Sequence, residues 1–124
     1  MPLIYEDLSY KINGFAFEVF RELGYGYKEK VYRNALAEKL KDNNLNYQKE
    51  CPYKIIRKGI VLGVYFMDLK VENKLVVEIK RDYYFKNQYI KQLYEYLKAT
   101  DLKLGLLICY SHKGVKIKRI VNIK

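Results

Sequence analysis

The 124-residue sequence has few of the residues that build many metal and catalytic sites. It contains one histidine, His112, and two cysteines, Cys51 and Cys109, which are far apart and form no Cys-x-x-Cys pair. These counts exclude a zinc finger, a four-cysteine iron–sulfur cluster and a histidine-based catalytic triad. Any metal ion bound by this chain must therefore be held by oxygen atoms.

Long apolar runs are also missing. None approaches the roughly 20 residues that span a bilayer, and the N-terminal segment carries Glu6 and Asp7 where a signal peptide would be basic. We therefore expect a cytoplasmic protein without a membrane-bound segment, in which both cysteines are reduced thiols. Cys109 lies inside an apolar run, so we expect it to be a small core residue rather than a nucleophile.

Acidic residues are scarce relative to basic ones. The chain has 24 Lys and Arg against 14 Asp and Glu, which gives a formal net charge of +10. Such an excess favours a polyanionic partner, either nucleic acid or an anionic membrane surface. The membrane alternative is weaker, because no cationic amphipathic helix stands out.

Apolar spacing predicts three helices and five strands in the order ααβββαββ. Intervals of three and four residues indicate helices over 4–23, 31–40 and 90–100. Runs of β-branched and aromatic residues indicate strands over 47–56, 60–71, 75–80, 104–110 and 115–123. The long helix before the fourth strand permits one parallel crossover in an otherwise antiparallel sheet. We therefore expect an α/β (α+β) fold, with a mixed central sheet flanked by helices in a single domain over residues 1–124.

The third predicted strand carries charges where a core strand should be apolar. Glu78 and Lys80 lie two residues apart in an otherwise apolar run, and so on the same face of the strand. A lone buried charge loses several kcal/mol of hydration free energy. These two charges must therefore be paired, bound to a metal ion or turned toward a wet cleft.

Asp68, near the end of the preceding strand, is predicted to lie opposite Glu78. If Glu72–Lys74 forms a three-residue loop, Val71 pairs with Leu75, and counting back places the two Cβ atoms about 5 Å apart. Two carboxylates at that separation favour a raised pKa or a divalent cation between them, and oxygen ligands suit Mg²⁺ or Mn²⁺. Two alternatives stay open: a two-residue loop, which would turn Asp68 to the other face, and a surface hairpin with ordinary salt bridges.

Four pieces of the sequence, in this order, resemble the GxxExxY family of the PD-(D/E)xK nuclease superfamily. They are Gly26 with Glu29 and Tyr32, then Asp68, then Glu78-Ile79-Lys80, then Gln92 with Tyr96. The resemblance covers about residues 15–121, although Met67 stands where the superfamily's name has proline. It implies a restriction-endonuclease-like core and a Mg²⁺-dependent nuclease that hydrolyses phosphodiester bonds in nucleic acid, with DNA as the expected substrate and Mn²⁺ as a substitute ion.

The resemblance also implies roles for individual residues. Asp68, Glu78 and the backbone carbonyl of Ile79 would be metal ligands, and Lys80 would be the catalytic lysine. Glu29 would be a further catalytic acid and a fourth metal ligand, which positions an ion or its water. The alternative for Glu29 is structural, because a carboxylate in the first turn of a helix is stabilised by the helix dipole without any catalytic role.

Gln92 and Tyr96 would complete the site, with the glutamine orienting groups near the metal and the tyrosine reaching the nucleic acid. They share a helix face that is turned away from the apolar stripe of that helix, so we expect both to be free to meet a ligand. An ordinary polar helix face is the alternative. Gly26 and Tyr32 are the structural part of the motif, where the glycine begins the helix and the tyrosine can be a core residue.

The substrate is expected to be held through its phosphates, for which Arg81, Lys86 and Lys91 are the candidates nearest the motif. A homodimer would let two sites address two strands. The alternative to an enzyme is a catalytically silent nucleic-acid-binding or partner-interaction module with the same fold. The intact set of Asp68, Glu78 and Lys80 argues against this alternative.

Overall fold

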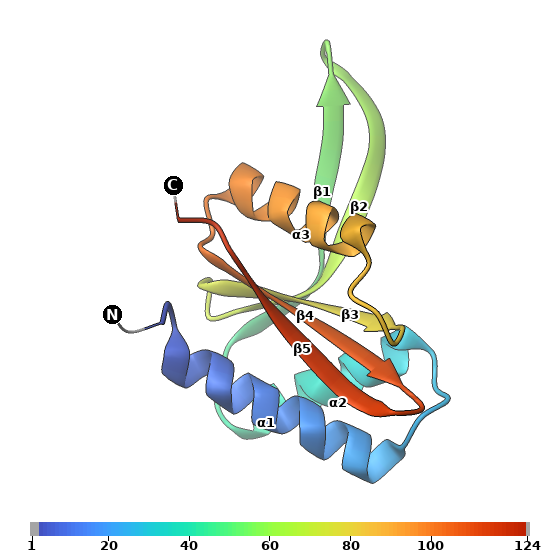
Figure 1. The fold of residues 1–124 in the computed structure, drawn as a ribbon. Helices are drawn as coiled ribbons and strands as arrows, with labels where there is room; N and C mark the ends of the chain where they lie inside the picture. The colour runs from blue at the N-terminus through green and yellow to red at the C-terminus, as the bar shows by residue number, and fades with distance from the viewer. Residues whose placement is uncertain (1–2, 124) are drawn as a thin grey trace.

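Eight elements follow one another in the order that the apolar spacing predicts. The computed structural model describes residues 3–123 (Figure 1). Its helices are α1 (Glu6–Leu23), α2 (Glu29–Asp42) and α3 (Asn87–Thr100), and its strands are β1 (Tyr47–Arg57), β2 (Ile60–Val71), β3 (Leu75–Arg81), β4 (Leu104–Ser111) and β5 (Gly114–Val121). Both α2 and α3 begin shortly before the first residue of their apolar patterns, because the first turn of a helix needs no buried side chain.

The strands form one mixed sheet in the order β1-β2-β3-β4-β5. Neighbouring strands are antiparallel except β3 and β4, which run parallel and are joined through α3. This is the single parallel crossover that the long third helix predicts. The α+β fold class and the order ααβββαββ are therefore confirmed.

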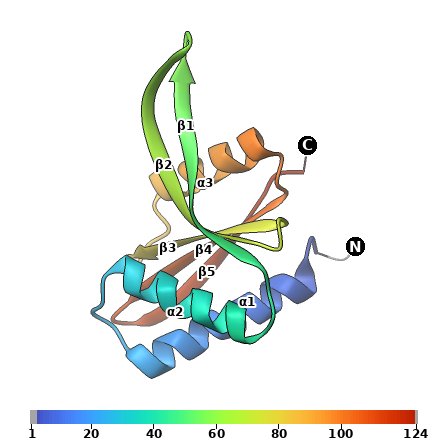
Figure 2. The ribbon, with the colours of Figure 1, turned by 180° about the vertical axis from the view of Figure 1, so that it is seen from behind.

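Helices cover both faces of the sheet, with α1 and α2 on one side and α3 on the other (Figures 1 and 2). The larger core lies under α1 and α2, where the rings of Tyr32 and Tyr110 stack with centroids 4.2 Å apart. The second core lies under α3 and contains both cysteines, Cys51 and Cys109. Within residues 3–123, no helix is both long and apolar enough to cross a membrane.

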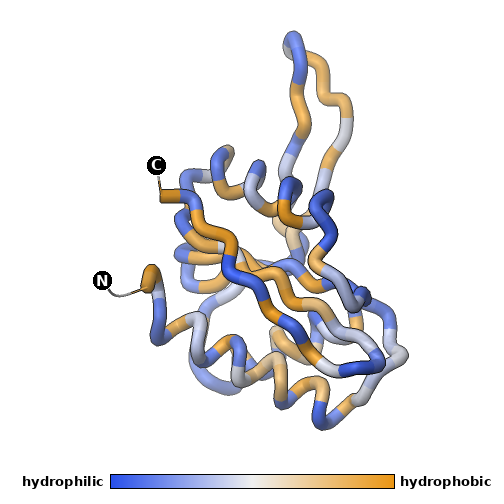
Figure 3. The backbone as a smooth tube through the Cα atoms, in the orientation of Figure 1, coloured by the Kyte–Doolittle hydropathy of each residue, from blue (hydrophilic) through white to orange (hydrophobic). Residues whose placement is uncertain are grey.

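The β1–β2 hairpin extends well beyond the rest of the sheet (Figures 1 and 2). β2 pairs with β3 only from Leu69 to Val71, whereas its pairing with β1 continues out to Ile60 opposite Arg57. Much of the projecting hairpin is made of hydrophobic residues (Figure 3). The large hydrophobic residues that are exposed there are Ile56, Ile60, Val61, Leu62, Val64, Tyr65 and Phe66. The sequence pattern predicts the two strands but not that they leave the sheet.

The hairpin leaves the sheet at Glu50 and Asp68. The β1–β2 ladder is interrupted between the pairs Lys49–Leu69 and Cys51–Met67, and Glu50 adopts a left-handed backbone conformation with φ of 55°. Non-glycine residues adopt this conformation rarely. The irregular backbone therefore coincides with the point where the two strands turn away from β3.

Gly105 of β4 sets how closely α3 packs on the sheet. A Cβ atom at this position would lie 2.8 Å from Cγ of the fully buried Leu93. We predict that Gly105→Ala lowers the free energy of unfolding by about 1–3 kcal/mol, the usual cost of overpacking. Gly14→Ala is the matched control: it lies in α1 with no neighbouring atom within 4 Å, and it should stabilise the protein by about 0.5–1 kcal/mol. Urea unfolding of both variants measures the difference, and equal stability would contradict the close approach.

Candidate active site

Asp68 and Glu78 lie side by side where β2 and β3 part. The turn between the strands is the three-residue loop Glu72–Lys74, in which the Lys74 N–H donates to the Val71 carbonyl over 2.9 Å. Val71 pairs with Leu75, and the last ladder pair is Leu69 with Val77. The next step along both strands places Asp68 opposite Glu78. The predicted register is therefore confirmed.

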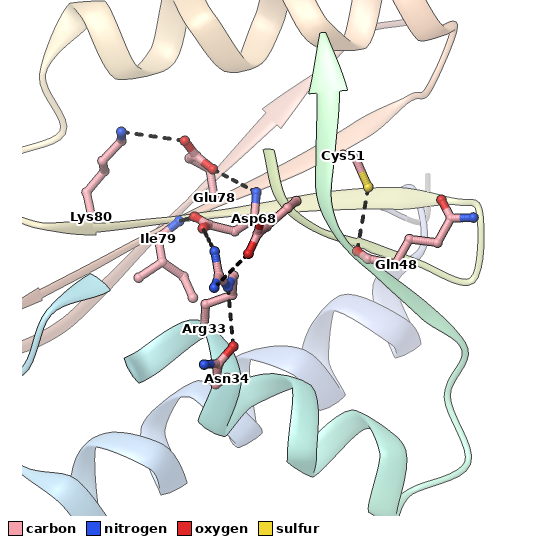
Figure 4. A network of polar contacts seen from close by, with 9 residues as sticks. Arg33, Asn34, Gln48, Cys51, Asp68, Glu78, Ile79 and Lys80 are labelled. Carbon is pink, nitrogen blue, oxygen red and sulfur yellow. Dashed lines mark hydrogen bonds and ion pairs between the residues drawn. The ribbon is translucent and has the colours of Figure 1, made fainter. Parts of the chain in front are cut away.

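Each of the two carboxylates accepts a hydrogen bond from the backbone of the other strand (Figure 4). The Asp68 N–H donates to Glu78 Oε1 over 3.1 Å, and the Ile79 N–H donates to Asp68 Oδ2 over 2.7 Å. These side-chain hydrogen bonds join the two strands beyond the last ladder pair, Leu69 with Val77. The two hydrogen bonds link β2 to β3 and also fix the positions of the two carboxylate groups.

Burial makes this pair electrostatically costly. The Asp68 and Glu78 side chains are only 14% and 9% exposed. Burial is the main cause that raises the pKa of both carboxyl groups, and for Glu78 the neighbouring Asp68 charge adds to it, which brings the Glu78 pKa to about 9. At neutral pH the pair therefore shares a proton or requires a nearby positive charge.

Two basic side chains partly supply that charge (Figure 4). Lys80 Nζ lies 3.5 Å from Glu78 Oε2, as expected for residues on one strand face, and 5.0 Å from the centroid of the Tyr89 ring of α3. Arg33 of α2 places Nη1 3.9 Å from Asp68 Oδ1. The sequence analysis missed Arg33, although its position four residues after Glu29 puts both on one helix face and was the available signal.

Glu29 is the first residue of α2 and joins that helix to β3. Its Oε2 accepts a hydrogen bond from the backbone N–H of Arg81 over 3.0 Å. The carboxylate lies close enough for its charge to raise the pKa of Asp68, although burial is the larger cause. In the part of the chain that the structure describes, no three His, Cys, Asp or Glu side chains are gathered as a metal-binding cluster. The expectation that Glu29 joins Asp68 and Glu78 as a metal ligand therefore has no support from this arrangement.

The donor set at the strand parting fits a hard divalent cation. Asp68 and Glu78 supply carboxylate oxygens, and burial raises the pKa of both groups, so a bound cation would favour their ionised form. The Ile79 N–H points toward β2, and in an extended strand the carbonyl of the same residue points to the same side. All three donors are oxygen atoms, the ligand type that Mg²⁺ and Mn²⁺ prefer.

Gly26 and Tyr32 shape the loop that leads into α2. Gly26 adopts φ of 119°, a conformation that favours glycine because other residues carry a Cβ atom. Tyr32 is fully buried, and its hydroxyl donates to the Gly24 carbonyl over 2.6 Å. The two residues fix the turn before α2, and so the position from which Glu29 reaches β3.

Tyr96 does not lie where the sequence analysis expects it. The ring is 2% exposed and packs edge-on against Tyr53 of the hairpin, with centroids 5.9 Å apart. The expectation that it is free to meet a ligand is wrong, because α3 packs against both the sheet and the base of the hairpin and buries more than one stripe. Gln92 is half-buried and faces a groove between α3 and the hairpin.

The three candidate phosphate-binding residues are exposed but differ in their contacts. The guanidinium of Arg81 lies 5.5 Å from the centroid of the Tyr25 ring. Lys86 Nζ forms an ion pair with Asp82 Oδ2 at 3.1 Å. Lys91 lines the same groove as Gln92. The charge of Lys86 is therefore partly neutralised within the protein.

The mixed sheet with helices on both faces, together with Asp68, Glu78 and Lys80 at the parting of two strands, defines a nuclease-like α+β domain. A profile of the PD-(D/E)XK nuclease superfamily matches residues 6–120, and the chain belongs to this superfamily. Its members are generally phosphodiesterase nucleases.

Comparison with solved structures agrees on the fold. The crystal structure of SSO0001 is similar to this chain with a TM-score of 0.55 at 22% sequence identity. The similarity covers 77% of this chain and 51% of that one, so the chain spans about half the length of SSO0001. No curated protein matches the sequence.

The raised pKa of Glu78 predicts that stability depends on pH. Between its ordinary value of 4.5 and about 9, the folded protein holds a proton that the unfolded chain has lost, so stability falls as pH rises through this window. Glu78→Gln, a neutral isostere, should raise the free energy of unfolding at pH 8 by about 1–3 kcal/mol and flatten the profile. Thermal unfolding from pH 5 to 9 in EDTA measures this. A wild-type stability that rises toward pH 9 would contradict the buried pair.

Proposed function

We propose that this chain is a metal-dependent nuclease of the GxxExxY type that hydrolyses phosphodiester bonds in DNA. The observation that carries the proposal is the buried carboxylate pair of Asp68 and Glu78, each bonded to the backbone of the opposite strand, with the Lys80 ammonium 3.5 Å from Glu78. Buried charges of this kind lower the stability of a fold, and groups with strongly perturbed pKa values cluster at functional sites. The net charge of +10 supports a polyanionic substrate.

Asp68, Glu78 and the Ile79 carbonyl would hold Mg²⁺, for which Mn²⁺ can substitute. When bound, such an ion supplies an activated water and neutralises charge on the scissile phosphate. Glu29 would position the water around the ion from the first turn of α2, where its charge acts on Asp68. The chain itself keeps the two carboxylates fixed through the backbone hydrogen bonds of Asp68 and Ile79.

Lys80 would orient the attacking water and offset the negative charge that builds on the phosphate. Its contacts with Glu78 and with the Tyr89 ring hold the ammonium group beside the pair. Gln92 would orient groups at the α3 side of the site. Arg81, Lys86 and Lys91 would bind substrate phosphates, and Arg33 would keep Asp68 oriented from the side of α2.

The direct test is cleavage of labelled single-stranded, duplex, flap and junction DNA in Mg²⁺, Mn²⁺ or EDTA. We predict metal-dependent cutting that falls at least 100-fold in Glu78→Ala and Lys80→Ala, since electrostatic contacts at a reacting phosphate contribute about 10²–10³ in rate. Lys41→Ala removes the same charge from an exposed position at the far end of α2 and should cut normally. Salt-sensitive DNA binding without cutting, unaffected by either site variant, would instead indicate a silent binding module.

Lys80→Arg separates a general positive charge from the specific lysine role. Arginine keeps the charge, but its planar, branched guanidinium cannot occupy the place of a compact ammonium group. We predict that Lys80→Arg binds DNA like the wild type and loses most of its cleavage rate in single-turnover assays. Full activity in this variant would refute the specific role of the lysine.

A further inference from the structure

A groove separates α3 from the projecting β1–β2 hairpin. Its volume is about 360 Å³, within the range of small-ligand sites. One wall is the hairpin face that carries Tyr53, Ile55 and Tyr65, and the other is the α3 face that carries Gln88, Lys91, Gln92 and Glu95. Apart from Gln92 and Lys91, none of these residues has a role in the proposed hydrolysis.

Both walls of the groove are close in the sequence to the residues around the carboxylate pair. Tyr53 and Tyr65 are directly opposite each other across the β1–β2 ladder. Tyr65 is three residues before Asp68, which corresponds to about 10 Å along an extended strand. On the other wall, Gln88 precedes Tyr89, whose ring contacts the Lys80 ammonium. A strand of several nucleotides bound at the pair is therefore long enough to reach the groove.

The walls combine aromatic rings with amide groups. Tyr65 is 41% exposed, so its ring is available to a ligand, and Tyr53 is held in place by its edge-on contact with Tyr96. Gln88 and Gln92 offer hydrogen-bond donors and acceptors from one helix face. The single acid, Glu95, is paired with Lys98 at 3.5 Å, which leaves the Lys91 charge for a phosphate.

We infer that this groove binds an unpaired segment of a DNA strand, with a base stacked on Tyr65 and Tyr53 and its backbone near Lys91. The inference rests on the proposed nuclease function and adds its substrate class, which is single-stranded DNA or the single-stranded part of a branched substrate. Every base has an aromatic face, so stacking here is tolerant of sequence. In a blunt duplex the faces of internal bases are covered by the neighbouring bases. No internal base is then free to stack on the tyrosine rings of the groove.

The test compares the affinity of a labelled oligothymidine strand with that of a blunt duplex carrying the same number of phosphates, by fluorescence anisotropy in EDTA. Tyr65→Ala should weaken single-strand binding roughly 5- to 100-fold, the loss expected for one stacked base. Duplex binding should change little. Tyr65→Phe keeps the ring and should bind the single strand like the wild type.

Phe66→Ala is the matched control, because Phe66 is the next residue of β2, points to the opposite face of the hairpin and is 59% exposed. It should leave single-strand binding unchanged. Thermal unfolding first establishes that the variants are folded. The inference is overturned if Tyr65→Ala binds the single strand like the wild type. It is also overturned if Phe66→Ala loses as much single-strand affinity, or if Tyr65→Ala loses as much affinity for the duplex.

Binding and cleavage fail independently in this design. If Tyr65→Ala binds single strands normally while wild-type DNA cleavage depends on Glu78 and Lys80, the groove assignment is wrong and the nuclease proposal stands. If Tyr65→Ala loses single-strand binding and the wild-type protein cleaves DNA with neither Mg²⁺ nor Mn²⁺, the groove assignment stands and the nuclease proposal is wrong.

Discussion

The architecture of this domain depends on a pair of buried carboxylates that join two strands by hydrogen bonds where the strands part. Asp68 and Glu78 each accept an N–H from the opposite strand at the point where β2 stops pairing with β3. Beyond that point β2 continues only with β1, and the hairpin is free to leave the sheet. The same pair forms the candidate site, lies where the hairpin leaves the sheet and carries an electrostatic cost that a divalent cation would reduce.

Elements on both faces of the sheet converge on this pair. From one side, α2 contributes Arg33 near Asp68, and Glu29 holds the backbone of β3. From the other side, α3 brings the Tyr89 ring over Lys80. Each contact fixes a charged group through a neighbour on a different element, which is the preorganisation that electrostatic catalysis requires. The close packing of α3 on Gly105 is part of the same arrangement.

Local pattern was enough to predict the elements, and it predicted the key register on the condition that the turn between β2 and β3 has three residues. Alternation and turn length place Asp68 opposite Glu78, because a three-residue loop allows only one facing pair. The local pattern could not predict how the elements pack in three dimensions. The hairpin leaves the sheet at Glu50, and a glutamate gives no indication in the sequence that it will adopt a left-handed conformation. Tyr96 is buried because α3 contacts two surfaces at once. Arg33 was missed because a basic residue on a helix usually faces solvent.

The most direct test of this account is a titration of the ¹⁵N-labelled protein with Mn²⁺, observed by NMR. A paramagnetic ion held by Asp68, Glu78 and the Ile79 carbonyl should broaden the amide signals of Asp68 and Ile79 first, since both N–H groups donate to the pair. Asp68→Asn should abolish this selective broadening. Broadening centred elsewhere, or the same broadening in Asp68→Asn, would contradict the assignment of the carboxylate pair as the metal site.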